Sequence, residues 1–166
     1  VSLFKERFQF FNPIQTQAFP ILYNTDDNTL IGARSGSGKT VCAELAMLRL
    51  WNQKPTGRVV YVAAHLDTLK LVMAEWQARF SALNRTIVLL TGETSADLKL
   101  LERAHVVLST PQHWDSLSRR WRQRKNVQNV DLFVVDGIHL LGGQNVRLFV
   151  IFLFGLTMEM SLGPVA

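Results

Sequence analysis

Cysteine and long apolar runs are scarce in this chain of 166 residues. The single cysteine, Cys42, allows no internal disulfide, which excludes a small disulfide-stapled fold and leads us to expect a reducing, intracellular location. The most apolar run, 148–158, is shorter than the ~20 residues of a membrane-spanning helix, so we expect it to be core and expect no membrane partner. Residues 1–11 mix charges into an aromatic segment, so secretion is not indicated.

Apolar residues, by contrast, make up 48% of the chain, and charged residues 19%. This composition can bury a core and argues against disorder, and the length favours one domain over two. A net charge of +5 favours polyanionic partners, although many basic domains bind no nucleic acid. Composition therefore leaves a nucleic-acid partner open.

A glycine-rich loop, ARSGSGKT, stands at 33–40 between an apolar stretch at 29–31 and an amphipathic run at 41–51. The order predicts a strand, a phosphate-binding loop and a helix. Glycines let successive N–H groups point at phosphate oxygens, the lysine reaches the outer phosphates, and the threonine hydroxyl suits Mg²⁺. The residues expected to bind nucleotide are Gly36, Ser37, Gly38, Lys39 and Thr40. The usual pattern starts with glycine where this chain has Ala33, and a turn without ligand is the alternative.

The acidic partner of such a loop is expected at Asp136, which ends the apolar run 132–135. P-loop enzymes use an acidic residue at the end of a neighbouring strand to hold the water shell of Mg²⁺. Thr40 and Asp136 are therefore the candidate metal residues. The alternative is an aspartate that only caps the next turn.

The whole chain alternates apolar β-type runs with helix-like segments. Strands are expected at 29–31, 58–63, 86–90, 105–109 and 132–135. Helices are expected after the glycine-rich loop, around 69–76, and from Thr110-Pro111, where threonine caps and proline begins a helix. The fold class is thus α/β, a mostly parallel sheet with helices on both faces.

Several of these segments together resemble the superfamily-two DExH-box RNA helicases, in particular their tandem-cassette branch. FNPIQ at 11–15 looks like the adenine-reading Q motif, ARSGSGKT like motif I, and residues 136–139 like a DEIH box. The longer runs 89–101 and 117–136 look most like the second, C-terminal cassette of spliceosomal members. The resemblance implies a RecA-like ATP-binding domain over 1–145 and an atypical apolar segment over 146–166.

The resemblance also implies ligands and partners. Gln15 would select adenine through its amide, with Phe11 as a stacking ring, so the cofactors would be ATP and Mg²⁺. Nucleic acid would be gripped through free N–H groups and hydroxyls where strands end, at Thr91, Gly92, Thr110 and Pro111. The implied partners are RNA, spliceosomal ribonucleoprotein proteins and the second RecA-like domain of the parent helicase, in the nucleus.

The chain departs from the family pattern at its catalytic position. Gly137 stands where the family has the glutamate that activates the attacking water, an effect typically worth ~10²–10⁴ in rate. His139 keeps the place that couples nucleotide state to the next domain. In the loop 63–69, Asp67 opposes phosphate contact, and the basic cluster 119–125 is either a solvated helix end or a docking surface.

Three functions follow from this pattern. The first is a hydrolysis-impaired ATP-binding domain with a regulatory or docking role, which makes RNA contact weak or indirect. The second is a fragment of an active RNA helicase that works once its second RecA-like domain is joined. The third, a P-loop kinase or transport ATPase, is disfavoured by the Q motif and the run 117–136. Whether the chain is an enzyme is left undecided between the first two.

Overall fold

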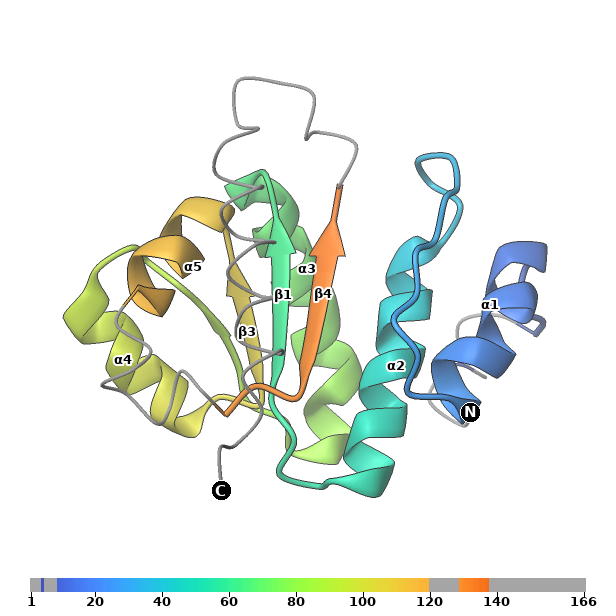
Figure 1. Ribbon diagram of the computed structural model, residues 1–166, viewed down its shortest axis with the longest axis horizontal. Coiled ribbons are helices and arrows are strands. Elements are labelled where there is room, and N and C mark those ends of the chain that lie inside the picture. The colour runs from blue at the N-terminus through green and yellow to red at the C-terminus, as the bar shows by residue number, and fades with distance from the viewer. Residues whose placement is uncertain (1–3, 5–8, 120–128, 138–166) are drawn as a thin grey trace. The chain divides into compact units, whose positions relative to one another are not determined.

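The computed structural model describes residues 4, 9–119 and 129–137, and its chain divides into two compact units, Val1–Gly57 and Arg58–Ala166. The first unit holds helices α1 and α2, and the second holds the sheet and the remaining helices (Figure 1).

In the first unit, α1 (Pro13–Asn24) packs against α2 (Lys39–Gln53). A capping box starts α1: the Asn12 side chain accepts from the Gln15 N–H at 2.9 Å, and the Gln15 side chain accepts from the Asn12 N–H at 3.1 Å. Pro13 then occupies the first turn, where no backbone donor is needed. The apolar cluster of this unit comprises Phe4, Val41 and Leu45, with Phe11, Phe19 and Leu48 packed against it.

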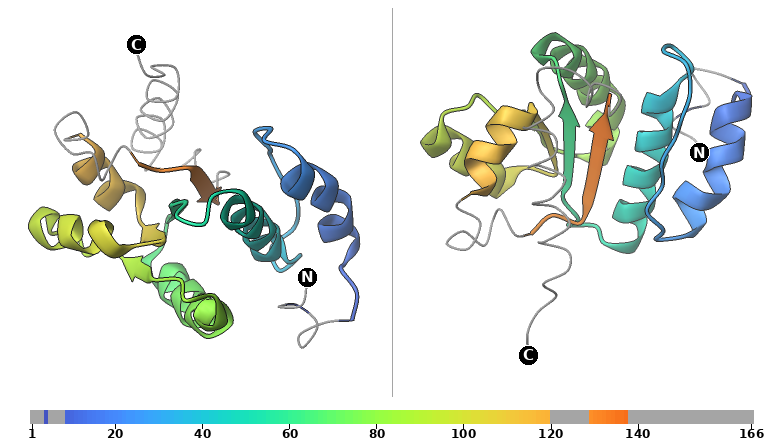
Figure 2. Two further views of the ribbon diagram at one scale, coloured as in Figure 1. Left: turned by 90° about the horizontal axis from the view of Figure 1, so that it is seen from below. Right: turned by 45° about the horizontal axis from the view of Figure 1, so that its top comes forward.

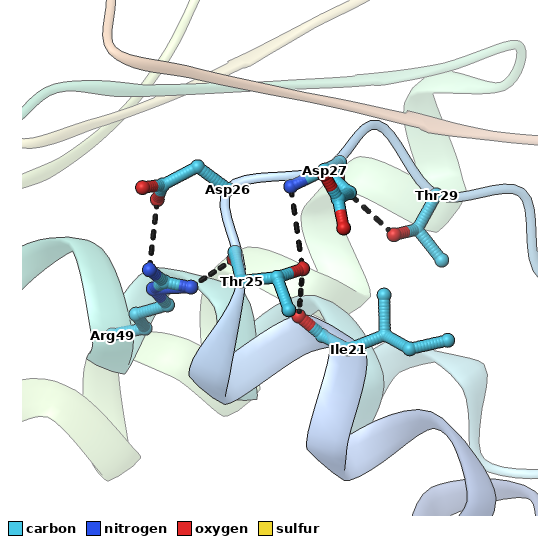
Figure 3. A network of polar contacts seen from close by, with 6 residues as sticks. All are labelled: Ile21, Thr25, Asp26, Asp27, Thr29 and Arg49. Atoms are coloured by element: carbon cyan, nitrogen blue, oxygen red, sulfur yellow. Dashed lines mark hydrogen bonds and ion pairs between the residues drawn. The ribbon is translucent and has the colours of Figure 1, made fainter.

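The end of α1 is tied to α2 by a polar network (Figure 3). Arg49 of α2 donates to the Thr25 carbonyl and pairs with Asp26 at 2.9 Å. The Thr25 hydroxyl donates to the Ile21 carbonyl at 3.0 Å and accepts from the Asp27 N–H at 3.3 Å. The segment that leaves α1 toward the glycine-rich loop is therefore anchored at its start.

Residues 25–34, between these helices, form neither helix nor strand. The strand expected at 29–31 is therefore wrong. A strand needs a neighbouring backbone to complete its ladder and an apolar side to bury. The stretch holds two apolar residues, of which Leu30 is exposed, and these supply too little buried surface to impose a strand.

The second unit is built on a parallel sheet of four strands in the order β2-β3-β1-β4. The strands are β1 (Val59–Ala63), β2 (Ile87–Leu89), β3 (Val106–Ser109) and β4 (Leu132–Asp136). The helices are α3 (Leu66–Phe80), the 3₁₀ turn η2 (Ser81–Leu83), α4 (Thr94–Arg103) and α5 (Pro111–Ser118). Parallel neighbours require such helical crossovers.

Helices cover both faces of this sheet, α3 on one side and α4 with α5 on the other (Figure 2). Alternation along β1 assigns the faces: Tyr61 contacts Trp76 of α3, while Val60 and Val62 join the cluster that contains Trp114 of α5. Every residue of β1 is buried, as expected of a central strand in a parallel sheet.

The predicted fold class, α/β with a mostly parallel sheet between helices, is confirmed, and so are four of the five predicted strands. No helix among the described residues is long and apolar enough to cross a membrane. The segment 146–166, and with it the apolar run 148–158, lies outside the described residues. Its assignment as an atypical end of the helicase domain stays a prediction.

Candidate functional site

The glycine-rich loop turns into α2 through two residues with positive φ, Gly36 at 75° and Gly38 at 81°. Only glycine adopts these angles without steric cost. Gly38 is the N-cap of α2 and has no side chain to occupy the first N–H groups of the helix. The start of α2 therefore offers an anion its backbone donors and its dipole.

Lys39 folds back over this loop. Its Nζ donates to the carbonyls of Ala33 at 2.9 Å and Arg34 at 2.7 Å. An ammonium has three donors, so one remains for a phosphate oxygen. Thr40 follows in the first turn of α2 and is half-buried, whereas the Arg34 side chain lies exposed. Lys39 and Thr40 thus lie at the start of α2, where the motif places them, and their roles toward phosphate and metal stay predictions.

Asn12 and Gln15 hold the loop from α1. Asn12 Nδ2 donates to the Ser37 carbonyl at 2.8 Å, and Gln15 Nε2 donates to the Gly38 carbonyl at 3.3 Å. Gln15 is buried, and a Cβ on Gly38 would stand 2.5 Å from its Nε2. We call Asn12 and Gln15 the loop clasp. The sequence analysis missed Asn12, although its spacing from Gln15 and the following proline is a helix-start pattern.

The adenine-reading role expected of Gln15 and Phe11 stays a prediction. In the Gln15 amide, Oε1 already accepts one hydrogen bond and Nε2 already donates one, so one N–H and one lone pair are left for a base. The Phe11 ring packs against Phe4 at 5.7 Å and against Phe19 at 6.2 Å between centroids. Both side chains therefore stabilise the first unit, whether or not they also contact a nucleotide.

In the second unit, Asp136 ends β4, and the Tyr61 hydroxyl donates to its Oδ2 at 2.7 Å. Burial, and then the charge of Asp136, raises the pKa of Tyr61 far above its usual range, so the phenol is a permanent donor. The sequence analysis missed Tyr61, because nothing in the local pattern connects two residues 75 positions apart. Gly137 follows Asp136 with φ 80°.

The loop after β2 differs from expectation. Thr91 and Gly92 were predicted to offer free N–H groups, but both donate to the buried Asp97 carboxylate, at 2.8 and 2.9 Å. The Thr91 hydroxyl also donates to Asp97 at 2.9 Å and accepts from the Glu93 N–H at 3.2 Å. That part of the prediction is wrong, because an acidic side chain from the next helix takes the donors. The sequence signal was the aspartate six residues after the threonine.

The loop after β3 forms a helix start, as predicted. Thr110 caps α5 by accepting from the His113 N–H at 3.3 Å, and Pro111 occupies the first turn. The His113 ring lies against Gly92, whose φ is 91°, and a Cβ there would meet Nε2 at 2.9 Å. The loops after the neighbouring strands β2 and β3 therefore meet through Gly92 and His113, and their role toward nucleic acid stays a prediction.

Three further sequence-level candidates are only partly described. Asp67 is exposed in the first turn of α3 and pairs with Lys70 at 3.5 Å. Of the basic cluster 119–125, Arg119 is exposed and pairs with Asp115 at 2.8 Å, and the other members lie outside the described residues. His139 also lies outside them.

The two candidate metal residues lie in different units, Thr40 in the first and Asp136 in the second. Among the residues that the structure describes, no group of three or more histidine, cysteine, aspartate or glutamate side chains could enclose a metal ion. Mg²⁺ in nucleotide sites takes one or two carboxylates together with substrate phosphates and waters. The Thr40 hydroxyl and the Asp136 carboxylate each suit Mg²⁺ chemically, and their role as metal residues stays a prediction.

Comparison with known proteins places these residues in a family. The DEAD/DEAH box helicase family matches residues 12–154. The chain belongs to that family. The match spans the loop clasp, the glycine-rich loop, Asp136 and the loops after β2 and β3, so the helicase resemblance is confirmed.

Individual relatives are similar over most of the chain. It is 55% identical to the U5 small nuclear ribonucleoprotein 200 kDa helicase of Homo sapiens over 145 residues, which are 87% of this chain and 7% of that protein. It is 53% identical to the DExH-box ATP-dependent RNA helicase DExH12 of Arabidopsis thaliana over 83% of this chain and 6% of that protein. It is 48% identical to the pre-mRNA-splicing factor brr2 of Schizosaccharomyces pombe over 86% of this chain and 7% of that protein.

Among solved structures, the fold is similar to that of the DUF1998 helicase MrfA. For the structure bound to DNA and AMPPNP the TM-score is 0.71 at 17% identity, over 92% of this chain and 24% of that one. This likeness bears on the fold alone. The chain spans a small fraction of every relative named here, so the activity of a whole helicase does not transfer to it directly.

Proposed function

We propose that this chain is the first RecA-like domain of a spliceosomal-type RNA helicase, that it binds ATP with Mg²⁺, and that it hydrolyses ATP weakly. The observation that carries the nucleotide part is the glycine-rich loop with its two left-handed glycines, its lysine folded over the loop, and the clasp of Asn12 and Gln15. The names of the spliceosomal relatives support the class of helicase.

The chain's own residues would bind the triphosphate as follows. Gly36 and Gly38 would direct backbone donors toward the phosphates at the start of α2, while Ser37 between them donates its N–H to the Arg34 carbonyl at 3.3 Å, and Lys39 would add its remaining N–H. Thr40 and Asp136 are the residues that would hold Mg²⁺. The ion supplies charge neutralisation at the transferred phosphoryl group when bound. Gln15 and Phe11 would face the adenine.

Weak hydrolysis follows from Gly137. A glycine has no group to orient or deprotonate the attacking water, and general-base catalysis is typically worth ~10²–10⁴ in rate. The positive φ of 80° at Gly137 also sets the backbone in a region that a glutamate adopts only at a cost of about 1–2 kcal/mol. Side chain and backbone therefore both depart from a competent catalytic loop.

A regulatory or docking role within a ribonucleoprotein is the consequence we draw. Contact with RNA would be weak, because the donors of Thr91 and Gly92 are committed to Asp97 and because Asp67 is exposed at the start of α3. The partners would be spliceosomal proteins and the second RecA-like domain, in the nucleus. The long runs at 89–101 and 117–136 favour the C-terminal cassette.

The alternative is an active helicase fragment whose turnover returns when the second RecA-like domain supplies its arginines, an effect worth ~10³–10⁵ in related phosphoryl transfers. The intact Lys39, Thr40 and Asp136 favour it.

One substitution distinguishes the hydrolysis-impaired domain from the active helicase fragment. Gly137→Glu is made in the full cassette, and phosphate release is followed with and without RNA. A rise of about tenfold or more in release would make the glycine the main lesion and support the impaired domain. Full activity of the unmodified cassette, with no gain from Glu, would support the active helicase instead.

A further inference from the structure

The loop clasp joins the start of α1 to the glycine-rich loop, within the first unit, through two side-chain amides. The Asn12 amide accepts from the Gln15 N–H at 2.9 Å and donates to the Ser37 carbonyl at 2.8 Å. The Gln15 amide accepts from the Asn12 N–H at 3.1 Å and donates to the Gly38 carbonyl at 3.3 Å. Each amide therefore caps the helix with its oxygen and holds the loop with its nitrogen.

Helix capping alone does not require an amide at position 12. Serine, aspartate and asparagine are similarly good N-caps, because each offers an oxygen to the first N–H groups of the helix. A carboxylate, however, has no N–H to donate, and a serine hydroxyl that caps the helix has no second arm to reach the loop. Only an amide offers an acceptor to the helix and a donor to the loop at once. The bond to the Ser37 carbonyl therefore explains why the cap is asparagine.

The two carbonyls that the clasp holds belong to consecutive peptide groups, and both peptides are trans. In a trans peptide the carbonyl and the following N–H point in opposite directions. Because the Ser37 and Gly38 carbonyls point at α1, the N–H groups of Gly38 and Lys39 point away from it. Among the described residues, neither N–H donates to a backbone carbonyl. Gly38 is left-handed and Lys39 begins a right-handed helix, a combination that gathers successive N–H groups around an anion.

We propose that Asn12 is a positioning residue for phosphate. It holds the peptide between Ser37 and Gly38 in the orientation that binds an anion, and so sets the affinity for the polyphosphate part of the nucleotide whatever the base. The proposal rests on the proposed ATP-binding function. Without this bond the loop also populates other orientations, and the apparent affinity falls in proportion to the fraction of chains that keep the binding one.

The test uses the full chain and calorimetric titration in Mg²⁺ with two ligands, ATP and inorganic triphosphate, which has no base. Asn12→Ser keeps a good cap for α1 but removes the donor to the Ser37 carbonyl. We expect its affinity for both ligands to fall by the same factor, about three- to tenfold, as for one neutral hydrogen bond. Asn12→Ala removes the cap as well, and the folded variant should show the same loss. Asn24→Ser, at the exposed last residue of α1, is the matched control and should bind both ligands as the parent does.

Three results would overturn the proposal and leave ATP binding intact. Parental affinity in Asn12→Ser, with a loss only in Asn12→Ala, would show that residue 12 acts only as a helix cap. A loss for ATP with unchanged affinity for triphosphate would assign the effect of Asn12 to the base. A parent chain that binds ATP but not triphosphate would show that the loop contributes too little. Absence of ATP binding by the parent chain would instead refute the proposed function, and the positioning role with it.

Discussion

Alanine at Gly38 should cost the first unit more free energy of folding than alanine at Gly36, although the two backbones are nearly alike. Both have positive φ, 81° and 75°, so each substitution carries about 1–2 kcal/mol of left-handed strain. At Gly36 nothing lies within 4 Å of the added Cβ. At Gly38 that Cβ would stand 2.5 Å from Gln15 Nε2 and 3.0 Å from Asn12 Nδ2.

The difference in folding free energy between the two alanine variants can be estimated from the hydrogen bonds of the loop clasp. To relieve the contact, the amides of Gln15 and Asn12 must move and give up their bonds to the Gly38 and Ser37 carbonyls. A neutral hydrogen bond contributes about 0.5–1.5 kcal/mol net, so the two add about 1–3 kcal/mol. We therefore expect a total of about 2–5 kcal/mol for Gly38→Ala, against about 1–2 kcal/mol for Gly36→Ala.

Hydrogen–deuterium exchange of peptides from α1 and α2 measures this difference in stability, because the protection of each peptide reports the free energy of opening that segment. Adding Gln15→Ala removes the side chain that the new Cβ meets, so in that background Gly38→Ala should cost little more than Gly36→Ala. Equal loss of protection in the two single variants would refute the clasp as a support of the loop.

Three other outcomes follow from the second unit. Asp97→Ala should lower the midpoint of thermal unfolding by several degrees, because the carboxylate accepts three hydrogen bonds. Glu102→Gln removes an exposed charge from the same helix and should change the midpoint little. Equal shifts in the two variants would contradict this account. His105 accepts a hydrogen bond from the Thr86 N–H, and burial, then the charges of two neighbouring arginines, lowers the pKa of His105 below the ordinary 6.5. The unfolded chain therefore binds a proton at this histidine more readily than the folded chain does, and the free energy of unfolding should fall as pH drops below about 6.5. His105→Asn should flatten that dependence in urea unfolding between pH 7 and pH 5, and an unchanged slope would exclude His105 as its source. Gly137→Ala should destabilise the chain by about 1–2 kcal/mol in the same assay, because φ there is 80°, and a neutral result would remove the backbone part of the argument on catalysis.

Patterns local in sequence predicted the fold well. The strands β1 to β4 consist mostly of apolar residues, and α5 carries its own start signal in the cap Thr110. The stretch 29–31 carries the same apolar signal but forms no strand, since a strand depends on a neighbour that its own residues do not encode.

The sequence motifs of the candidate site could be predicted, but most of the residues that hydrogen-bond to those motifs could not. Lys39, Thr40 and Asp136 stand where the motifs place them, at the start of α2 and the end of β4. Tyr61 escaped notice because a hydrogen-bond partner set by sheet register has no fixed spacing in the sequence, whereas Asp97 lies only six residues after Thr91 and could have been found. The error at Thr91 and Gly92 arose because their small size suggested open donors and the nearby acidic side chain was not considered.

The most direct test of the central proposal is a calorimetric titration of the chain with Mg²⁺-ATP, with phosphate release measured on the same sample and with Lys39→Ala as the control. Binding that Mg²⁺-GTP does not match, that Lys39→Ala abolishes and that proceeds without measurable release is the predicted result. Failure of the folded chain to bind ATP, or steady release by the chain alone, would contradict the account.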